Sequence, residues 1–229
     1  MKTNNGLQIA IDGPSGSGKS TIAKALAMQL GYVHIDTGAM YRAVALHAYR
    51  AGISWSDEAG VLAILDGINI GIKHTSSGQR IYLGGDDVTD AVRTAEIGVG
   101  ASVVAPHSGV RAKLVLLQQD LAKNQNVVMD GRDIGTVVLA YAPVKIFLTA
   151  SLEARVARRL GELSAMSLDF DADEITEQMR QRDYDDENKS KALKRADDAV
   201  VLDTSNMNID EVVAQITKII ESKGAQKNV

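Results

Sequence analysis

The chain has 229 residues, and its 25 lysines and arginines against 29 aspartates and glutamates give a formal net charge of −4. Apolar residues make up 45% of the sequence and cysteine is absent, so we expect a globular core and exclude disulfide bridges and cysteine-held metals. The acidic balance and an aromatic content of 4% argue against binding to nucleic acid polymers. The sequence has no signal-peptide pattern and no apolar run of about 18 residues. We therefore expect a cytoplasmic protein without a membrane partner, acting as a monomer.

Short apolar runs alternate with segments of helical spacing through most of the chain. Buried strands are predicted at residues 7–12, 32–35, 127–129, 144–149 and 199–202. Helices are predicted at 19–30, at 39–50, from 151 to about 163, and after a capping box that begins at Asn208. This alternation predicts an α/β fold in a single domain, 1–229, with a doubly wound, five-stranded parallel sheet covered on both faces.

Two stretches depart from this alternation. Residues 68–89 hold two runs of alternating polarity around a Thr-Ser-Ser-Gly turn, which predicts a β-hairpin inside an inserted lobe at about 60–95. Residues 161–195 are highly charged and poor in large apolar side chains, which is typical of an exposed, mobile helical flap.

The residues after the first predicted strand match the pattern G-x-x-x-x-G-K-[ST], in the strand-then-helix context that this motif requires. Glycines let successive backbone N–H groups face a phosphate, the helix adds its positive dipole end, and Lys19 reaches the β- and γ-phosphates. The hydroxyl of Ser20, or of Thr21, is suited to ligate Mg²⁺ directly or through water. The residues expected to bind the triphosphate are Gly13, Pro14, Ser15, Gly16, Ser17, Gly18, Lys19, Ser20 and Thr21. The plainer alternative is a glycine turn between a strand and a helix.

Such a loop indicates a nucleoside triphosphate and Mg²⁺ but does not identify the acceptor. Three classes compete: a switch GTPase, a small-molecule kinase and a nucleotide-binding module without turnover. A GTPase needs an N-K-x-D guanine reader. The nearest match, at residues 188–191, has Lys191 where the aspartate must stand, so we discount the GTPase.

Two further polar segments follow predicted strands, and we expect them at the same sheet edge as the loop. DTGAMYR occupies 36–42 and DGRDIGT occupies 130–136. Arg42 and Arg132 offer bidentate donors to phosphate, whereas Thr37, Ser102 and Asp133 are short groups suited to reading a base edge. Taken singly, each is more simply interpreted as a solvated arginine or a turn-forming polar residue. Together at one edge, they favour a site for a second phosphate-bearing molecule.

With these segments the sequence resembles the bacterial cytidylate kinases, a family of nucleoside monophosphate kinases. The matching segments are GPSGSGKST at 13–21, DTGAMYR at 36–42, GASVVA…VR ending at 111, DGRDIGTVV at 130–138, APVKIFLTAS at 142–151, RD at 182–183 and ADDAVVLDTS at 196–205. The resemblance implies a P-loop fold with a monophosphate-binding lobe at 36–105, which includes the hairpin insertion at about 68–89, and a helical lid at 152–195.

The same resemblance implies a role for each matching side chain. The cytosine would be surrounded by Thr37, Ser102, Arg111 and Asp133. The acceptor phosphate would be held by Arg42 and Arg132 with Tyr41 alongside, and the ribose by Arg182 and Asp186. The ATP phosphates would face Arg155, Arg158 and Arg159 when the lid closes. The residues implied to act in the transfer itself are Lys19, Arg132, Arg182 and Arg158.

Two features depart from the family pattern. Lys189 stands seven residues after Arg182, where the family has a second phosphate-binding arginine, and lysine keeps the charge but loses the bidentate fork. The stretch after Lys189 is one residue shorter than usual and lacks the family's proline. Lys191, Lys194 and Arg195 are alternatives for this role, which stays unassigned.

The reaction implied is ATP + CMP ⇌ ADP + CDP, with dCMP also accepted. A phosphate acceptor is already anionic near neutral pH because its second pKa is about 6, so no general base is expected. Three alternatives stay open: a kinase for a small hydroxyl compound with Asp36 or Asp133 as base, a kinase for another nucleoside monophosphate, and a binding module without turnover. By spacing alone, the arginines at 155, 158 and 159 also fit a surface face paired with Glu153 and Glu162. The four histidines lack metal-ligand spacing and are expected to be structural or superficial.

Overall fold

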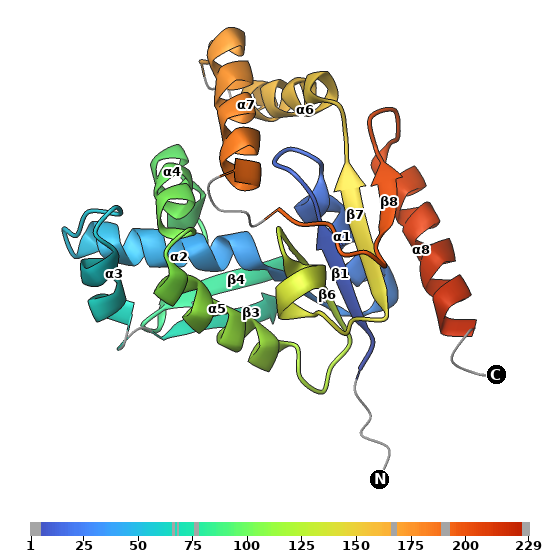
Figure 1. Ribbon diagram of the computed structural model, residues 1–229, viewed down its shortest axis with the longest axis horizontal. Coiled ribbons are helices and arrows are strands. Elements are labelled where there is room, and N and C mark those ends of the chain that lie inside the picture. Colours follow the sequence, from blue (N-terminus) through green and yellow to red (C-terminus); the bar gives the residue numbers. More distant parts are fainter. Residues whose placement is uncertain are drawn as a thin grey trace.

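A computed structural model describes residues 6–65, 67, 69–75, 78–165, 169–188 and 193–225 (Figure 1). Five strands form one all-parallel sheet in the order β2-β6-β1-β7-β8. They are β1 (Gln8–Asp12), β2 (Val33–Asp36), β6 (Val127–Gly131), β7 (Val144–Thr149) and β8 (Val200–Asp203). The central strand β1 is buried on both faces, which explains its short run of apolar residues without alternation.

Two apolar layers cover the two faces of this sheet. On one face, α1 (Lys19–Leu30) and α8 (Ile209–Ala225) pack against Ile9 and Ile11 of β1. On the other face, the C-terminal part of α5 (Ser108–Leu121) and the π-helical turn η2 (Ile134–Val138) cover Ala10. Successive strand residues point to opposite faces, so a single strand supplies both layers. The predicted doubly wound α/β fold is confirmed.

The segment between β2 and β6 builds a second core, on the left of Figure 1. Its elements are α2 (Thr37–Arg50), α3 (Glu58–Leu65), β3 (Ile70–Thr75), β4 (Gly78–Leu83), β5 (Asp86–Asp87), η1 (Ala91–Arg93), α4 (Ala95–Val104) and the start of α5. β3 and β4 pair antiparallel with Ile72 opposite Ile81, so the predicted hairpin is confirmed. The side-chain oxygen of Gln79 accepts a hydrogen bond from the Asp36 amide at 2.9 Å. This bond joins the hairpin to the end of β2.

Helices α6 (Leu152–Ala165) and α7 (Ala172–Asn188) form a hairpin beyond the carboxyl ends of the strands, at the top of Figure 1. The predicted start of α6 is confirmed, because Ser151 Oγ accepts a hydrogen bond from the Ala154 amide at 3.2 Å. The predicted capping box before α8 is also present between Asn208 and Glu211. Within the described ranges, no helix combines the length and apolar character needed to span a bilayer.

Candidate active site

The loop between β1 and α1 is held open by backbone conformations that glycine adopts easily. Gly16 and Gly18 have φ angles of 74° and 87°, in the left-handed region where a side chain is strained. Gly18 directly precedes Lys19, the first residue of α1. The first N–H groups of this helix, which have no partner inside it, therefore lie at the end of the loop, as an anion site requires. We call residues 13–18 the phosphate loop.

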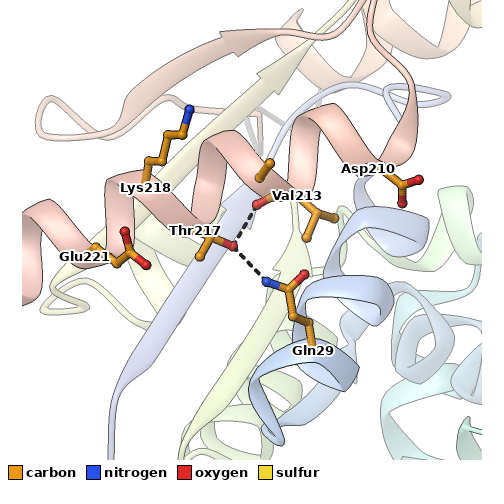
Figure 2. Close-up of a pocket in the computed structure, with 7 residues that line it drawn as sticks. Gln29, Asp210, Val213, Thr217, Lys218 and Glu221 are labelled. Carbon is orange, nitrogen blue, oxygen red and sulfur yellow. Dashed lines mark hydrogen bonds between the residues drawn. The ribbon is translucent and has the colours of Figure 1, made fainter.

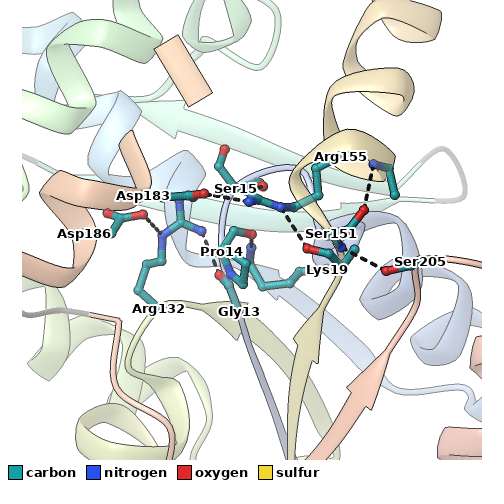
Figure 3. A network of polar contacts seen from close by, with 12 residues as sticks. Gly13, Pro14, Ser15, Lys19, Arg132, Ser151, Arg155, Asp183, Asp186 and Ser205 are labelled. Carbon is teal, nitrogen blue, oxygen red and sulfur yellow. Dashed lines mark hydrogen bonds and ion pairs between the residues drawn. The ribbon is translucent and has the colours of Figure 1, made fainter. Parts of the chain in front are cut away.

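Four carbonyl oxygens of the phosphate loop each accept a hydrogen bond from a different cationic side chain. Figure 3 draws three of these cations, Arg132, Lys19 and Arg155, around the loop. The four contacts are Arg132 to Gly13 at 2.9 Å, Lys19 to Pro14 at 2.6 Å, Arg155 to Ser15 at 3.0 Å and Arg158 to Ser17 at 3.5 Å. These cations come from α1, from the segment after β6 and from α6. The loop is thus surrounded by positive charge supplied from three places in the chain.

Lys19 is almost fully enclosed, with 8% of its surface exposed. Burial, and secondarily the charge of Arg132, lower the pKa of its ammonium group to about 7. The lysine therefore loses its proton far more easily than a lysine in water. An anion bound in the loop would reverse this effect.

Ser20 begins a polar chain that leads away from the loop. Its hydroxyl donates to Asp130 Oδ2 at 2.6 Å, and the other carboxylate oxygen of Asp130 lies 2.8 Å from His34 Nε2. The predicted Thr37 adjoins this chain, since its hydroxyl donates to the backbone oxygen of Asp130 at 2.8 Å. The sequence predicts no role for Asp130 and a structural or superficial one for His34. Asp130 could have been found from its position directly after the predicted buried strand at 127–129, where a polar side chain reaches the edge of the sheet.

Asp12, at the end of β1, holds the segment that carries Arg132 and Asp133. Its two carboxylate oxygens accept hydrogen bonds from the amides of Ile134 and Gly135, at 2.7 and 2.8 Å. Burial raises the pKa of this carboxyl to about 6, although both amides act in the opposite direction. The folded protein therefore binds the Asp12 proton more tightly than the unfolded chain does.

We expect wild type to gain about 1 kcal/mol of unfolding free energy relative to Asp12→Asn when the pH falls from 7 to 5. A carboxyl with a raised folded-state pKa contributes most stability at low pH and loses it as the pH rises through about 6. Asparagine does not titrate, so the difference between the two proteins isolates this group. Urea unfolding of both proteins at the two pH values measures it. A difference that stays constant, or moves the other way, contradicts the titration assigned to Asp12.

The predicted acceptor residues from α2 and α5 lie in ion pairs. Arg42 pairs with Asp36 at 3.1 Å, while its Nε is buried and has no hydrogen-bond partner within the described part of the chain. Arg111 forms a close ion pair with Asp133. Burial raises the pKa of Asp133, although Arg111 opposes this, and burial raises the pKa of the Tyr41 phenol to about 12.

Helix α7 brings Arg182 and Asp186 to the same region. Arg182 donates to the Ser102 hydroxyl of α4 at 2.9 Å, and Asp186 Oδ2 lies 2.8 Å from Arg132 Nε. Burial and then the neighbouring charges of Arg132 and Arg42 lower the pKa of Arg182. Three arginines from different parts of the fold are therefore close enough to repel one another. Such a cluster is stabilised by an anion between them.

Two of the three arginines of α6 contact the phosphate loop, and the third does not. Arg158 reaches the phosphate loop and also donates to the Thr204 hydroxyl at 3.2 Å. Arg159 is partly exposed and forms an ion pair with Glu162 at 3.1 Å, as in the surface alternative expected for that residue. Arg155 is buried between the phosphate loop and α7 and binds Asp183. The predicted contacts of all three with ATP phosphates stay predictions.

Among the described residues, the remaining candidates form no hydrogen bond or ion pair with the side chains of the arginines and the lysine around the phosphate loop. Thr21 is exposed on the first turn of α1. Lys194 and Arg195 are exposed on the segment before β8. Lys189 and Lys191 lie outside the described residues. The cation that replaces the family arginine therefore stays unassigned.

The donor set at Ser20 fits a magnesium ion that is bound together with a nucleotide. The exposed Ser20 hydroxyl lies beside the Asp130 carboxylate, and oxygen atoms of these types are the ligands that Mg²⁺ prefers. Among the described residues, no group of three or more histidines, aspartates or glutamates could hold a metal ion. A magnesium ion at this position would therefore take its other ligands from phosphate and water.

A hollow of about 350 Å³ lies elsewhere, between α1 and α8 (Figure 2). Gln29 on its wall donates to the Thr217 hydroxyl at 3.3 Å. Gln29 stands near the C-terminal end of α1, roughly 15 Å along the helix from Lys19, given a rise of about 1.5 Å per residue. The hollow is therefore separate from the cationic cluster.

The fold and the phosphate loop define a P-loop kinase. The family model described as "Cytidylate kinase" matches residues 9–222. A cytidylate kinase of Lactobacillus johnsonii is 46% identical over 223 residues, covering 97% of this chain and 96% of that protein. One of Exiguobacterium sibiricum is 47% identical over 216 residues, covering 94% and 97%. The chain belongs to the cytidylate kinase family, and it is an enzyme of that family.

A likeness to solved structures bears on the fold alone. An uncharacterised protein from Eubacterium ventriosum superposes with a TM-score of 0.52 at 13% identity, covering 94% of this chain and 98% of that one.

Proposed function

We propose that this enzyme transfers the γ-phosphoryl group of ATP to CMP and dCMP, forming CDP and dCDP by direct in-line displacement. The observation that supports this most is the convergence of Arg42, Arg132 and Arg182 where Arg132 joins the phosphate loop to Asp186 of α7. Desolvation, and then the charges of Arg132 and Arg42, lower the pKa of Arg182. Arg132 also touches Gly13 of the phosphate loop. A phosphate-bearing acceptor between these arginines would lie next to a triphosphate in the loop.

The proposal divides the single domain 1–229 into a donor side and an acceptor side. Residues 36–105 would form the lobe that binds the monophosphate, and residues 152–195 the lid. The acceptor phosphate would lie between Arg42 and Arg132 with Tyr41 alongside, and Arg182 and Asp186 would contact the ribose. The cytosine edge would face Thr37, Ser102, Arg111 and Asp133.

The transfer as proposed needs no proton acceptor. The attacking oxygen belongs to a phosphate monoester, whose second pKa of about 6 leaves it ionised near neutral pH. The main obstacle is repulsion between two polyanions, and Lys19, Arg132, Arg158 and Arg182 would reduce it. The α6–α7 hairpin would exclude water that could otherwise hydrolyse ATP.

Magnesium, when bound with ATP, would neutralise charge on the β- and γ-phosphates. Ser20 would hold it, directly or through water, and Asp130 would orient the Ser20 hydroxyl through their 2.6 Å hydrogen bond. His34 would in turn keep the Asp130 carboxylate in place.

The reaction is tested by measuring ADP release from ATP with CMP, dCMP, UMP, AMP, shikimate and gluconate as acceptors. We expect kcat/KM to be highest for CMP and dCMP. Turnover with UMP or AMP well above that with CMP would reject the assignment of the base. Turnover only with shikimate or gluconate would indicate a hydroxyl acceptor, and no acceptor-dependent turnover would indicate a binding module.

Asp133→Ala is expected to lower the ratio of kcat/KM for CMP over UMP by about tenfold, with kcat for CMP changing less than about threefold. The physical reason is that the part-buried Asp133–Arg111 pair would present a fixed polar pattern to the base edge. Asp120→Ala, in an exposed ion pair with Lys123 at the end of α5, is the matched control. Equal losses for CMP and UMP would argue against base reading by Asp133.

A further inference from the structure

Arg155 is the most enclosed of the α6 arginines, with 6% of its surface exposed. Its Nε donates to the Ala150 oxygen at 3.1 Å and its Nη1 to the Ser15 oxygen at 3.0 Å. Both terminal nitrogens also bind the Asp183 carboxylate, at 3.0 and 2.6 Å. One guanidinium therefore joins the end of β7, the phosphate loop and α7 (Figure 3). Only the planar fork of arginine offers donors in this arrangement.

A second contact reinforces the first. Met179 lies one helical turn before Asp183 on α7 and is 7% exposed. A Cβ atom built on Gly16 would lie 2.8 Å from the Met179 methyl group, so this helix lies directly on the tip of the phosphate loop. The face of α7 that bears Met179 and Asp183 is thus the face seated on the loop.

Two arginines of the proposed transfer, Arg158 and Arg182, and the proposed ribose ligand Asp186 lie within one helical turn of this pair. Arg158 is three residues after Arg155 on α6, while Arg182 and Asp186 lie one residue before and three residues after Asp183 on α7. If α7 moved away from the phosphate loop, Arg182 would move away from Ser102 and Asp186 would move away from Arg132. The Arg155–Asp183 pair is therefore placed to control both sets of contacts.

We propose that Arg155 and Asp183 are positioning residues that latch the α6–α7 hairpin onto the phosphate loop. In this role Arg155 binds Ser15 and Asp183 and does not itself contact phosphate. The phosphate would be contacted by its neighbours Arg158 and Arg182. The effect on catalysis rests on the proposed function, whereas the latch itself does not. A buried ion pair that loses one partner leaves the other charge uncompensated, so either substitution opens the latch.

The latch is tested first without nucleotide, by amide hydrogen exchange in the full chain. Arg155→Ala and Asp183→Asn are each expected to speed exchange in 13–18 and 172–188 by about tenfold. Arg180→Ala is the matched control, because Arg180 lies on the same helix in an exposed pair with Glu177 at 3.7 Å. Exchange in the central strand β1 should stay as in wild type, which shows that each variant is folded. Unchanged exchange in α7 of either folded variant overturns the latch.

Kinetics then separate the latch from a direct phosphate contact. For a latch, Arg155→Ala, Asp183→Asn and the double variant should lower CMP-dependent kcat by a similar factor of about 10², and the effects should not add. ATP hydrolysis without acceptor should rise relative to transfer, because water enters an open site. Arg155→Lys should not restore kcat, since an ammonium group lacks the fork.

A direct phosphate contact gives a different pattern. Arg155→Ala alone would raise KM for ATP, Arg155→Lys would partly restore it, and Asp183→Asn would stay near wild type. That pattern overturns the latch. If wild type itself showed no CMP-dependent turnover while exchange still changed as expected, the proposed function would fail and the latch would stand.

Discussion

Arg132→Ala is expected to lower kcat/KM for CMP by about 10³, while the dissociation constant for ATP changes less than about threefold. Arg132 lies between the phosphate loop and α7, bound to Gly13 on one side and to Asp186 on the other. It is thus the side chain best placed to compensate charge on both the donor and the acceptor. Its loss would leave the two phosphate groups to repel each other in the transition state.

Two variants define the interpretation of this result. Arg132→Lys retains the charge without the bidentate fork and should give an intermediate loss. Arg50→Ala, an exposed arginine at the end of α2, should behave as wild type. Initial rates with CMP varied at saturating ATP, together with calorimetric titration of ATP, supply both quantities. A loss smaller than about tenfold in kcat/KM would remove Arg132 from the acceptor site.

Lys19→Met is expected to lower kcat by about 10³ or more, because the ammonium group would follow the charge that develops on the transferring phosphoryl group. Methionine keeps the length and apolar stem of lysine, so the buried position stays filled. In wild type, the protonation of Lys19 should also be measurable when ATP binds. Its pKa of about 7 leaves about nine in ten molecules uncharged at pH 8.

Binding of ATP at pH 8 should therefore be accompanied by uptake of nearly one proton in wild type and of none in Lys19→Met. The sign follows from the phosphates, which favour the charged lysine and raise its pKa on binding. Calorimetry in two buffers with different ionisation enthalpies measures the proton count directly. Proton release, or equal uptake by both proteins, contradicts the assignment of the titrating group to Lys19.

Periodicity and turn chemistry predict the main elements because these depend on nearby residues. The helix at 19–30 and the strand at 144–149 have the same bounds in the structure. Helix α2 begins at Thr37, two residues earlier than expected, because the Asp36 carboxylate caps it by accepting from the Ala39 amide at 3.0 Å. The two-residue strand β5 is too short to show a period.

Polar contacts between distant parts of the chain were harder to predict from the sequence. β6 was expected to end at Met129, yet it continues to Gly131 because Asp130 and Gly131 pair with Ile11 and Asp12 of β1. The Asp130 side chain is satisfied there by its bonds to Ser20 and His34. Likewise, Asp12 binds amides more than 120 residues away, and no local pattern identifies such a partner. The sequence motifs thus indicated which side chains belong at the sheet edge, while the pairing among them required the fold.

The four cations that contact the phosphate loop, Lys19, Arg132, Arg155 and Arg158, affect which anions can bind there. From far away, an approaching ion meets an acidic particle of net charge −4. At physiological salt, screening limits the reach of each charge to about 8 Å, so the bulk repulsion fades before contact is made. Close to the loop, the same ion comes within that distance of Lys19, Arg132, Arg155 and Arg158, and the attraction is confined to molecules small enough to approach them. A compact triphosphate satisfies this condition and a long polyanion does not.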